Sequence, residues 1–438
     1  MSAAHEKYFL ETYGCQMNEY DSELVRSILN QNGFSETDNE SESDIILLNT
    51  CSVRENAHNK VFGRLQKIGE LRKQKQHLLV GVLGCMAQSL KMDLLESSVS
   101  VDIVAGPDSY RKLPQLIETA ADGSGGAADF DLSEFETYDD IYPVRKERVN
   151  AWIAVMRGCD NFCTFCVVPY ARGRERSRSL EHVTIETEKL VADGYSQVSL
   201  LGQNVNSYTH ENRSFADLIR AVADVDGIKR VRFTSPHPKD FPDDLLDVIA
   251  ENKKVCSHIH LPLQAGSDRI LKMMRRNYTA DEYLALVDKI KNTISDLVLT
   301  TDIILGFPTE TREEYEQTVN LVEAVGFDSA FIFNYSERPG TVAKRRWEDD
   351  VAADEKKYRI TKLNEIQKMI SVKQNHRHIG QTMELLVEGP SKRDSSQWVG
   401  RTDGNKMAVF PRDAQRTGDY IKVKITDATA NTLKSEIA

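Results

Sequence analysis

The amino-acid sequence predicts an α/β protein with three successive domains: an N-terminal open parallel α/β sheet, a central partial (β/α)6 barrel and a small all-β barrel at the C-terminus. Short β-rich runs alternate with amphipathic stretches in the first third of the chain, and the same alternation resumes after residue 150. The segment after residue 377 holds only short strands separated by turns. A chain of 438 residues is long enough for about two or three domains.

The first third of the chain reads as βαβαβαβ. Strands and helices are expected, in order, at Tyr8–Tyr13, Glu19–Asn32, Asp44–Asn49, Glu55–Gln74, His77–Leu83, Ala87–Ser97 and Val101–Ala105. This alternation predicts a mostly parallel sheet with ligands beyond the carboxyl ends of its strands. An acidic, Gly-rich segment between Ala121 and Tyr142 is expected to be a linker or mobile loop that ends the N-terminal domain, residues 1–145.

Six apolar strands predict the partial barrel of the central domain, residues 146–377. They are expected at Ala151–Met156, Gln197–Leu201, Lys229–Phe233, Ser257–Leu261, Val298–Leu305 and Ser329–Phe333. A long polar helix over about Val351–Arg377 follows the last of them. The C-terminal domain, residues 378–438, is expected to be a small β-barrel. Its strands are expected at Thr382–Val387, Val399–Thr402, Met407–Val409 and Ile421–Ile425.

Composition narrows the class of protein. The chain has no run of eighteen apolar residues and no charged-then-apolar N-terminal signal, so we expect no membrane span, no export and a cytoplasmic location. Its seven cysteines are an odd number in a charged chain without a signal, which favours reduced thiols and metal ligation over disulfides. The net charge of −11 makes any nucleic-acid contact depend on local basic patches.

The spacing C-x-x-x-C-x-x-C at Cys159, Cys163 and Cys166 predicts an iron–sulfur cluster. Three thiolates leave one iron of a 4Fe-4S cluster without a protein ligand, and such an iron can bind a reactant. The alternative is a structural zinc site, which needs four ligands and a closed tetrahedron. These cysteines follow the first barrel strand, at the end where barrel enzymes carry their active sites.

Three other cysteines each follow a strand of the N-terminal sheet. Cys15 follows the first strand, Cys51 the second and Cys85 the third, so all three fall on loops at one edge of the sheet. The alternative is three separate buried thiols, since cysteine is often buried. The shared position favours a second three-cysteine cluster, again with one open iron. Cys256 belongs to no such pattern and is expected to be a small buried residue.

Basic residues form three runs, each of which is either a nucleic-acid contact or a solvated face. The runs are Arg172, Arg174, Arg176 and Arg178; Lys272, Arg275 and Arg276 before Tyr278; and Lys344, Arg345 and Arg346 before Trp347. In the C-terminal domain, basic residues are interleaved with Trp398 and Phe410, a mixture that holds phosphates and stacks bases. Those basic residues are Lys392, Arg393, Arg401, Lys406, Arg412 and Arg416.

Four segments resemble the methylthiotransferases, a family of radical S-adenosylmethionine enzymes with an N-terminal cluster domain, a radical SAM barrel and a C-terminal TRAM domain. The segments are Thr12–Asn18, Asn49–Arg54, Gly84–Gln88 and Cys163–Tyr170. The aromatic Phe165 before Cys166 is part of the radical SAM motif. Within the family, Gly14–Ser22 and Asn49–Ala57 resemble the type that modifies isopentenyladenosine in tRNA.

The resemblance implies insertion of sulfur and a methyl group at carbon 2 of N(6)-isopentenyladenosine at tRNA position 37. It implies two 4Fe-4S clusters and S-adenosylmethionine. The expected partners are the tRNA anticodon stem-loop, an electron donor such as flavodoxin or ferredoxin, and iron–sulfur carrier proteins, with a monomeric enzyme and no membrane. The alternatives are threonylcarbamoyl-adenosine in tRNA or a ribosomal-protein aspartate as substrate, and, in another class, a non-catalytic iron–sulfur RNA-binding protein.

Besides Phe165, four polar residues at or after the barrel strands are candidates for cofactor binding. Gln203 and Asn204 follow the second strand, where many radical enzymes place a carboxylate against the methionine amino group, and a simple turn is the alternative. Gln264 and Asp302 lie at or near the barrel mouth and are either ligand contacts or ordinary loop and strand residues. His258 and His260 share one strand face, but no third metal ligand accompanies them in the sequence.

Overall fold

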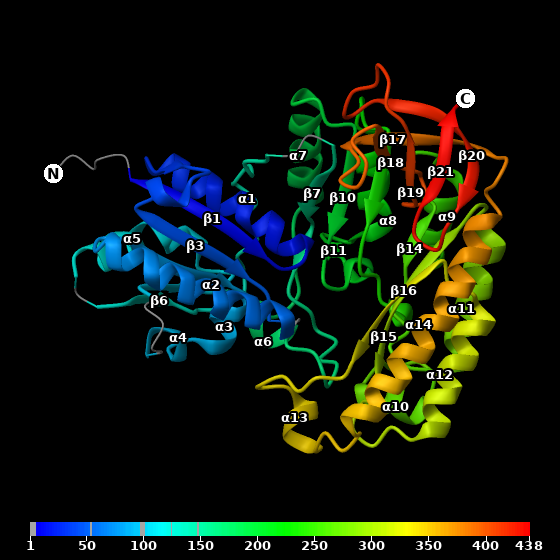
Figure 1. The fold of residues 1–438 in the computed structure, drawn as a ribbon, viewed down its shortest axis with the longest axis horizontal. Coiled ribbons are helices and arrows are strands. Elements are labelled where there is room, and N and C mark those ends of the chain that lie inside the picture. Colours follow the sequence, from blue (N-terminus) through cyan, green and yellow to red (C-terminus); the bar gives the residue numbers. More distant parts are fainter. Residues whose placement is uncertain (1–5, 53–54, 97–100, 124, 147–148) are drawn as a thin grey trace.

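The computed structural model describes residues 6–52, 55–96, 101–123, 125–146 and 149–438. Three parts follow one another along the chain: an N-terminal sheet in blue and cyan, a curved central sheet in green and yellow, and a closed barrel in orange and red (Figure 1). The predicted three-part α/β architecture is therefore confirmed. No helix within the described ranges combines the length and apolar character that crossing a bilayer requires.

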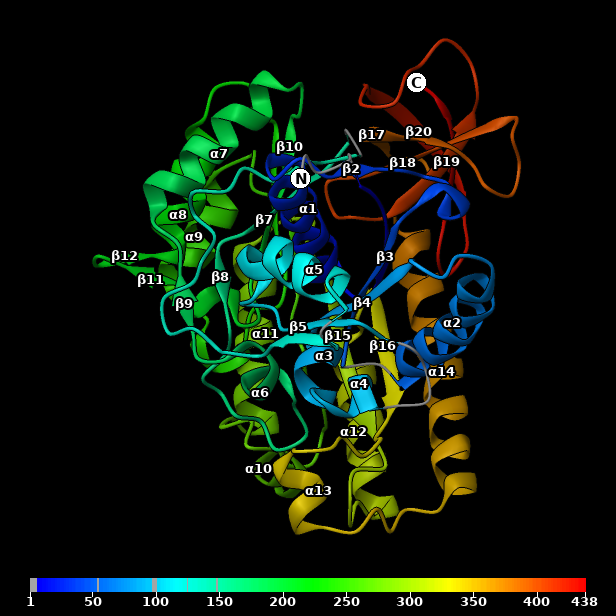
Figure 2. The same cartoon turned by 90° about the vertical axis from the view of Figure 1, so that its left-hand side faces the viewer.

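The N-terminal sheet is entirely parallel and has the strand order β2-β1-β3-β4-β5-β6. Its strands are β1 (Lys7–Tyr13), β2 (Ser35–Glu36), β3 (Ile45–Thr50), β4 (Leu79–Gly84), β5 (Ile103–Ala105) and β6 (Ala127–Asp129). Its helices are α1 (Gln16–Gln31), α2 (Glu55–Gln74), α3 (Cys85–Leu90), α4 (Asp93–Glu96) and α5 (Leu113–Ala121). Helices α1 and α5 contribute to the core on one face of the sheet, and α2, α3 and α4 to that on the other (Figure 2). The central strands are therefore apolar on both faces.

Two local expectations in this part are corrected. The helix expected at Ala87–Ser97 is broken at Lys91, whose φ of +49° separates α3 from α4; Ser97 lies outside the described residues. The acidic segment is not a free linker, because β6 pairs with β5 and adds a sixth strand to the sheet. Tyr138, further along this segment, is fully buried and donates to the carbonyl oxygen of Pro107 at 3.0 Å. Ser124 lies outside the described residues.

The central part contains the six predicted strands in sequential order. They are β7 (Ala151–Ala154), β10 (Gln197–Leu201), β13 (Arg230–Phe233), β14 (His258–His260), β15 (Val298–Leu305) and β16 (Ser329–Asn334). They form two three-stranded sheets, and a parallel bridge between Val231 and Val255 connects β13 with the segment that leads into β14. On β15, the half-buried Thr300, Asp302 and Ile304 alternate with fully buried residues. This period of two gives the curved sheet an open inner face and a face packed against helices.

Most helices of the central part cover the outer face of this partial barrel, and their side chains join its core. The helices of this part are α6 (Val168–Arg172), α7 (Leu180–Ala192), α8 (Phe215–Asp224), α9 (Asp243–Glu251), α10 (Asp268–Met274), α11 (Ala280–Thr293), α12 (Arg312–Val325), α13 (Val342–Arg346) and α14 (Ala353–His376). Helix α6 packs against α3 of the N-terminal part instead. Short strands pair in the loops: β8 (Met156–Arg157) with β9 (Arg176–Ser177), and β11 (Thr209–His210) with β12 (Arg213–Ser214). Several helices begin at a Ser or Thr that accepts a backbone N–H, as Thr311 does at α12.

The C-terminal barrel is closed in the order β17-β18-β19-β21-β20. Its strands are β17 (Thr382–Pro390), β18 (Gln397–Arg401), β19 (Met407–Pro411), β20 (Tyr420–Ala428) and β21 (Leu433–Ile437). The turn between β18 and β19 packs against the amino-terminal ends of the central strands. There the Arg232 guanidinium donates to the carbonyl oxygens of Asp403 and Thr402, each at 2.7 Å. The C-terminal barrel therefore covers the end of the central barrel that lies opposite the loops bearing Cys159.

Candidate active site

Three cysteines follow neighbouring strands of the N-terminal sheet: Cys15 after β1, Cys51 after β3 and Cys85 after β4. The register pairs Tyr13 with Thr50 and Thr50 with Gly84, so the three strands end at the same level. The backbone N–H of Cys51 also donates to the carbonyl oxygen of Tyr13 at 2.9 Å. The structure thus places these cysteines at one edge of the sheet, where the sequence predicts them.

The thiols of these cysteines face one another and a buried arginine. A hydrogen bond with Cys51 is the largest cause that lowers the pKa of Cys15, to about 6, and the Arg172 guanidinium acts in the same direction. Burial raises the pKa of Cys85, the charge of Arg172 opposes this, and a charge on Cys15 adds to it. A thiol with a lowered pKa at the start of a helix is a good thiolate ligand.

Two buried asparagines hold the loops that carry Cys15 and Cys51. Asn18 donates through Nδ2 to Asn49 Oδ1 and to the carbonyl oxygen of Thr50, both at 3.2 Å. Asn49 returns a bond from its Nδ2 to the carbonyl oxygen of Asn18 at 3.0 Å. A Cβ atom at Gly14 would lie 2.3 Å from Asn18 Oδ1, so a side chain there would displace this contact. These contacts explain residues of two of the four motifs on which the resemblance rests, Thr12–Asn18 and Asn49–Arg54. Val53 and Arg54 of the second of these lie outside the described residues.

Cys159, Cys163 and Cys166 form the second group, directly after β8. The backbone N–H of Cys166 donates to the carbonyl oxygen of Cys163 at 2.9 Å, which folds the loop onto itself. Burial is the main cause that raises the pKa of Cys159 and of Cys166 to about 12 each, and a charge on Cys163 acts in the same direction. Arg276 donates from Nη1 to Cys163 Sγ at 3.4 Å. Phe165 is half-buried against the core of the central barrel.

The two cysteine groups fit iron–sulfur clusters better than zinc. Each group provides three cysteine thiols. A structural zinc ion needs four ligands around one centre. A cluster needs a wider arrangement, because each cysteine binds a different iron. Iron also displaces the thiol protons, so the raised pKa values of Cys159 and Cys166 make loading pH-dependent without preventing it.

Gly158 allows the chain to turn into the second cysteine loop. Its φ is +80°, and an added Cβ would lie 2.0 Å from the carbonyl oxygen of Arg174. Because that oxygen belongs to the backbone, we expect Gly158→Ala to lower the free energy of unfolding by about 2–4 kcal/mol, measured by urea unfolding of the cluster-free protein.

The control for this prediction is Gly194→Ala. Gly194 also has a positive φ, +93°, but apart from its own chain neighbours no heavy atom of the described residues lies within 4 Å of the added Cβ. This variant carries the backbone strain without the overlap, so we expect a loss of about 1 kcal/mol. Equal losses in the two variants would show that the contact with Arg174 has no effect on stability.

Buried polar atoms without partners gather after β10 and β13. Gln203 Oε1, Asn204 Oδ1 and His237 Nε2 have no hydrogen-bond partner among the described residues. The two loops are joined by a bond from the Val205 N–H to the carbonyl oxygen of Ser235 at 3.3 Å. Burying an unpaired acceptor or donor costs about 1–3 kcal/mol. Two acceptors and one donor at the carboxyl ends of adjacent barrel strands are therefore free to bind a polar ligand.

His237 and Arg276 also belong to this region, although the sequence predicts neither as a site residue. The backbone N–H of Lys239 donates to His237 Nδ1, which leaves Nε2 as the protonated nitrogen. Burial, with the charges of Arg276 and Lys239, lowers the pKa of His237 to about 2, so its ring is neutral at physiological pH. The only sequence signal for His237 is its position just after a barrel strand. Arg276 stands in a basic run, which the sequence interprets as a nucleic-acid contact or a solvated face.

The other predicted polar residues lie near the inner face of the central barrel. Gln264 has a φ of +72°, and its backbone bonds to β15 through Asp302 and Ile304. The carboxylate of Asp302 lies 3.4 Å from His260 Nε2. His258 and His260 both bond to the hydroxyl of Thr300, at 3.1 and 3.0 Å, so their common face is explained by this contact.

Several basic residues expected on a possible nucleic-acid surface are buried instead. Arg172, Arg176 and Arg178 are buried, and only Arg174 of that run is exposed, at 68% of its side chain. In the C-terminal barrel, Trp398 and Phe410 belong to the core and cannot stack on bases from that position. Lys406 is held in an ion pair with Asp328 at 2.6 Å. The remaining exposed basic residues of these patches include Lys344, Arg345, Arg346, Lys392, Arg393, Arg412 and Arg416.

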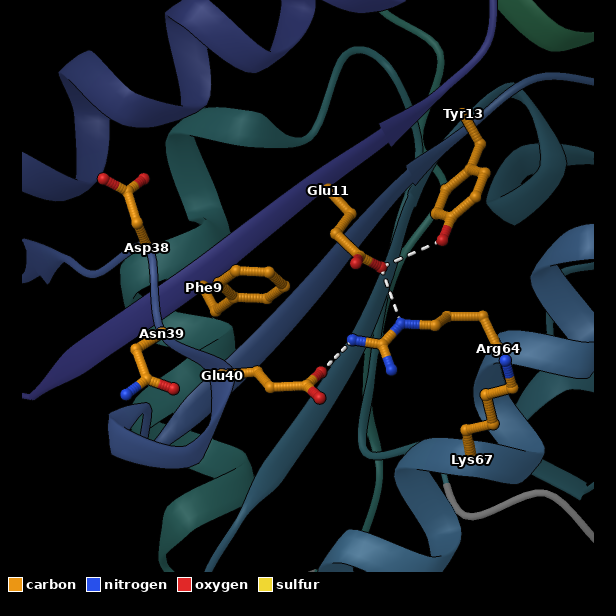
Figure 3. A pocket seen from close by; sticks show the side chains of 8 residues that line it. All are labelled: Phe9, Glu11, Tyr13, Asp38, Asn39, Glu40, Arg64 and Lys67. Atoms are coloured by element: carbon orange, nitrogen blue, oxygen red, sulfur yellow. Dashed lines mark hydrogen bonds and ion pairs between the residues drawn. The ribbon is translucent and has the colours of Figure 1, made fainter.

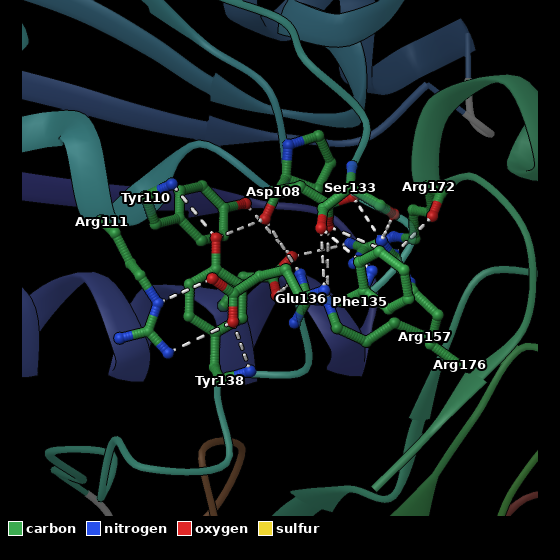
Figure 4. A network of polar contacts seen from close by, with 12 residues as sticks. Asp108, Tyr110, Arg111, Ser133, Phe135, Glu136, Tyr138, Arg157, Arg172 and Arg176 are labelled. Carbon is green, nitrogen blue, oxygen red and sulfur yellow. Dashed lines mark hydrogen bonds and ion pairs between the residues drawn. The ribbon is translucent and has the colours of Figure 1, made fainter.

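The buried arginines join the N-terminal sheet to the central barrel (Figure 4). Asp21 on α1 accepts from Arg157 at 3.0 Å and from Arg172 at 2.7 Å. Asp108 accepts from Arg176 at 2.6 and 3.2 Å. These partners are far apart in the sequence. The arginines that follow Cys166 therefore lie at the interface between the two parts.

A surface hollow on the N-terminal sheet is separate from both cysteine groups (Figure 3). It is lined by Phe9, Glu11, Tyr13, Asp38, Asn39, Glu40, Arg64 and Lys67. Arg64 bridges Glu11, at 2.8 Å, and Glu40. The lining residues include no cysteine, and its charged groups are largely paired with one another.

Three family profiles match successive parts of the chain. Residues 7–106 match the "Uncharacterized protein family UPF0004", residues 153–322 the "Radical SAM superfamily" and residues 376–438 the "TRAM domain". Among solved structures, the radical S-adenosylmethionine methyltransferase TsrM from Kitasatospora setae is similar, with a TM-score of 0.59 and 16% identity. This match covers 78% of this chain and 77% of that one, and it supports the fold alone.

Curated relatives match almost the whole length. Proteins from Bacteroides fragilis and Bacteroides thetaiotaomicron are 47% and 48% identical, respectively, over 439 residues, which is 99% of this chain and 96% of each relative. Both are named tRNA-2-methylthio-N(6)-dimethylallyladenosine synthase. At this identity and coverage, together with the three profiles in their order, the chain belongs to the tRNA-2-methylthio-N(6)-dimethylallyladenosine synthase family of radical SAM proteins.

Proposed function

We propose that this chain is a tRNA methylthiotransferase that converts N(6)-isopentenyladenosine at position 37 into its 2-methylthio derivative. The observation that carries the proposal is the similarity to relatives with that activity in their name, which are 47% and 48% identical over 99% of this chain. Dimethylallyl in that name and isopentenyl here denote the same group. The two three-cysteine groups support it, because the reaction needs both a radical source and a sulfur carrier.

The chain would hold S-adenosylmethionine and two 4Fe-4S clusters. Cys159, Cys163 and Cys166 are the proposed ligands of the radical cluster, and Cys15, Cys51 and Cys85 those of an auxiliary cluster. The bound groups supply the electron and the radical needed to activate an aromatic C–H bond, which offers a general base no acidic proton. The proposed domains span residues 1–145, 146–377 and 378–438.

The residues around the radical cluster would bind and orient the cofactor. The unpaired oxygens of Gln203 and Asn204 can accept from an ammonium group, and the His237 Nε2–H can donate to a carboxylate or hydroxyl oxygen. Arg276 holds a positive charge beside Cys163. Phe165, Gln264 and Asp302 are the further proposed contacts.

The inner face of the barrel offers an aromatic surface for the target base. Phe331 is 55% exposed and Phe333 40% exposed, and the register pairs Phe331 with Asp302. The ring of His260 lies edge-on to Phe331, with centroids 6.0 Å apart. A nucleotide that leaves the anticodon stack can be held by such a surface.

The proposed partners follow from the same assignment. The tRNA anticodon stem-loop would contact exposed basic residues on α13 and on the C-terminal barrel, such as Arg345 and Arg412. An electron donor such as flavodoxin or ferredoxin would reduce the radical cluster, and iron–sulfur carrier proteins would load both sites. We place the reaction in the cytoplasm and the enzyme as a monomer.

Nucleoside analysis of a deletion strain tests the substrate. A strain that lacks its own enzyme of this type should accumulate isopentenyladenosine, and expression of this chain should restore 2-methylthio-isopentenyladenosine, as measured by mass spectrometry of digested tRNA. Restoration of a methylthiolated threonylcarbamoyl-adenosine, or of a modified ribosomal-protein aspartate, would contradict the proposed substrate.

A further inference from the structure

Arg172 reaches from the central barrel into the N-terminal cysteine site. It is the last residue of α6, six positions after Cys166, and α6 packs against α3, which begins at Cys85. Its side chain is 3% exposed. Its guanidinium binds Asp21 on α1, the helix that begins directly after Cys15. One arginine of the radical SAM loop is therefore part of the other cysteine site.

The contacts of Arg172 leave one side of its guanidinium free. Nη2 donates to Asp21 Oδ2 at 2.7 Å. Nη1 is buried and has no hydrogen-bond partner among the described residues. Asp21 also accepts from Arg157 at 3.0 Å and from the Tyr110 hydroxyl at 3.2 Å, so its two carboxylate oxygens serve three donors. Nη1 is thus a buried charged donor that lacks an acceptor, which costs free energy unless a ligand provides one.

The carboxylates of this interface are already engaged. Arg157 and Arg172 share Asp21, and Arg176 binds Asp108. Burial raises the pKa of Tyr110 and of Tyr138, so neither hydroxyl supplies a further negative charge. A buried guanidinium that shares its carboxylate with a second arginine is stabilised by another anion beside it.

We propose that Arg172 is a positioning residue for the auxiliary cluster: its Nη1–H donates to the cluster of Cys15, Cys51 and Cys85, and its charge compensates the negative charge of that cluster. The proposal rests on the proposed second cluster. Three thiolates give an oxidised 4Fe-4S cluster a net negative charge, and reduction adds another. Hydrogen bonds and charges at the sulfurs are main determinants of cluster potential, so Arg172 makes the auxiliary cluster easier to reduce.

This assignment also connects the two cysteine groups mechanically. Arg157 precedes Cys159 by two residues, Arg172 follows Cys166 by six, and both bind Asp21 on the helix that starts after Cys15. The auxiliary cluster is therefore completed only when the N-terminal sheet is docked on the central barrel. Chain segments from both parts then fix the separation between the two clusters.

The test isolates the auxiliary cluster by replacing Cys159, Cys163 and Cys166 with alanine in the full chain. In this background, a redox titration followed by electron paramagnetic resonance gives the midpoint potential after anaerobic reconstitution. We expect Arg172→Met to make reduction at least tenfold less favourable, a shift of about 59 mV to lower potential for one electron. We expect Arg172→Lys, which keeps the charge, to shift it less.

Arg176→Met is the matched control, because Arg176 is a buried arginine of the same interface that pairs with Asp108. It removes one ion pair between the two parts, while the pairs of Arg157 and Arg172 with Asp21 keep them docked, so the potential of the auxiliary cluster should not shift. Equal shifts in Arg172→Met and Arg176→Met, or no shift in the former, would overturn the proposal. If the background chain binds no cluster at all, the proposed auxiliary site itself fails.

A second measurement covers the case in which Arg172→Met does not fold. Arg172→Lys and Arg176→Lys both keep the charge, but a lysine cannot donate to Asp21 and to the cluster in the planar geometry of arginine. We expect iron release to a chelator to be several-fold faster from Arg172→Lys than from Arg176→Lys. Equal release rates would overturn the assignment of Arg172 as a contact of the cluster.

Discussion

Substitution of Cys159 by alanine is expected to abolish reductive cleavage of S-adenosylmethionine. With only Cys163 and Cys166 left as ligands, the radical cluster loses one of its three anchors and with it the defined open iron. The measurement is release of 5'-deoxyadenosine by the reconstituted, reduced protein, quantified by liquid chromatography. We expect the rate to fall below detection.

Cys256→Ala provides the control for this result. Cys256 is also buried, and burial raises the pKa of its thiol to about 12, but it lies beside Arg232 and Asp403 at the opposite end of the barrel. Its loss removes a thiol without touching either proposed cluster, so cleavage should stay near the level of the unchanged protein. Substantial cleavage by Cys159→Ala would contradict the assignment of Cys159, Cys163 and Cys166 as ligands of the radical cluster.

The second large effect is expected for Cys51→Ala, which should leave cleavage of S-adenosylmethionine measurable and eliminate the methylthiolated product. Cys51 is the thiol that contacts Cys15, so its removal disrupts the proposed auxiliary cluster alone. The radical cluster is held by a different loop on the central barrel. Both products are measured in one reaction, 5'-deoxyadenosine and 2-methylthio-isopentenyladenosine.

Spectroscopy of the same preparation decides how this second result is interpreted. The radical cluster of Cys51→Ala must show the signal of the unchanged protein before the comparison is made. Equal loss of cleavage and methylthiolation, with that cluster intact, would contradict the division of the reaction between two sites. Retention of the methylthio product would instead remove Cys15, Cys51 and Cys85 from the transfer step.

The sequence predicts the strands of the two sheets well because their apolar runs are long and lie between clear turn signals. Gln197–Leu201 and Val298–Leu305 have the predicted bounds in the structure. The strands β2 and β6 were missed because two or three residues form no pattern, and pairing with longer neighbours stabilises them. Local sequence carries no information about such partners.

The acidic segment shows how tertiary contacts override composition. Glycines and acidic residues predict a flexible linker, but Tyr138 within this segment is buried beneath Arg157, whose guanidinium lies 4.9 Å from the ring centroid. This contact joins residues on either side of the predicted domain boundary. The arginine run after Cys166 was misassigned for the same reason, because Asp21, the partner of Arg172, is 151 positions away.

The cysteine groups could be predicted because each lies at a strand end, where topology alone brings side chains together. The residues that surround them could not. His237 and Arg276 become candidates only when burial, the unpaired Nε2 atom and the contact with Cys163 are known. The opposite error concerns Trp398 and Phe410, whose alternation with basic residues indicated base stacking although both pack inside the barrel.

The most direct test of the proposed function is mass spectrometry of nucleosides from tRNA that carries isopentenyladenosine, after incubation with the anaerobically reconstituted, reduced protein and S-adenosylmethionine. We expect 2-methylthio-isopentenyladenosine together with 5'-deoxyadenosine. Release of 5'-deoxyadenosine without a methylthiolated nucleoside would contradict the assigned substrate. Absence of both products, with both clusters and the reductant verified, would contradict the assignment of this chain as a radical methylthiotransferase.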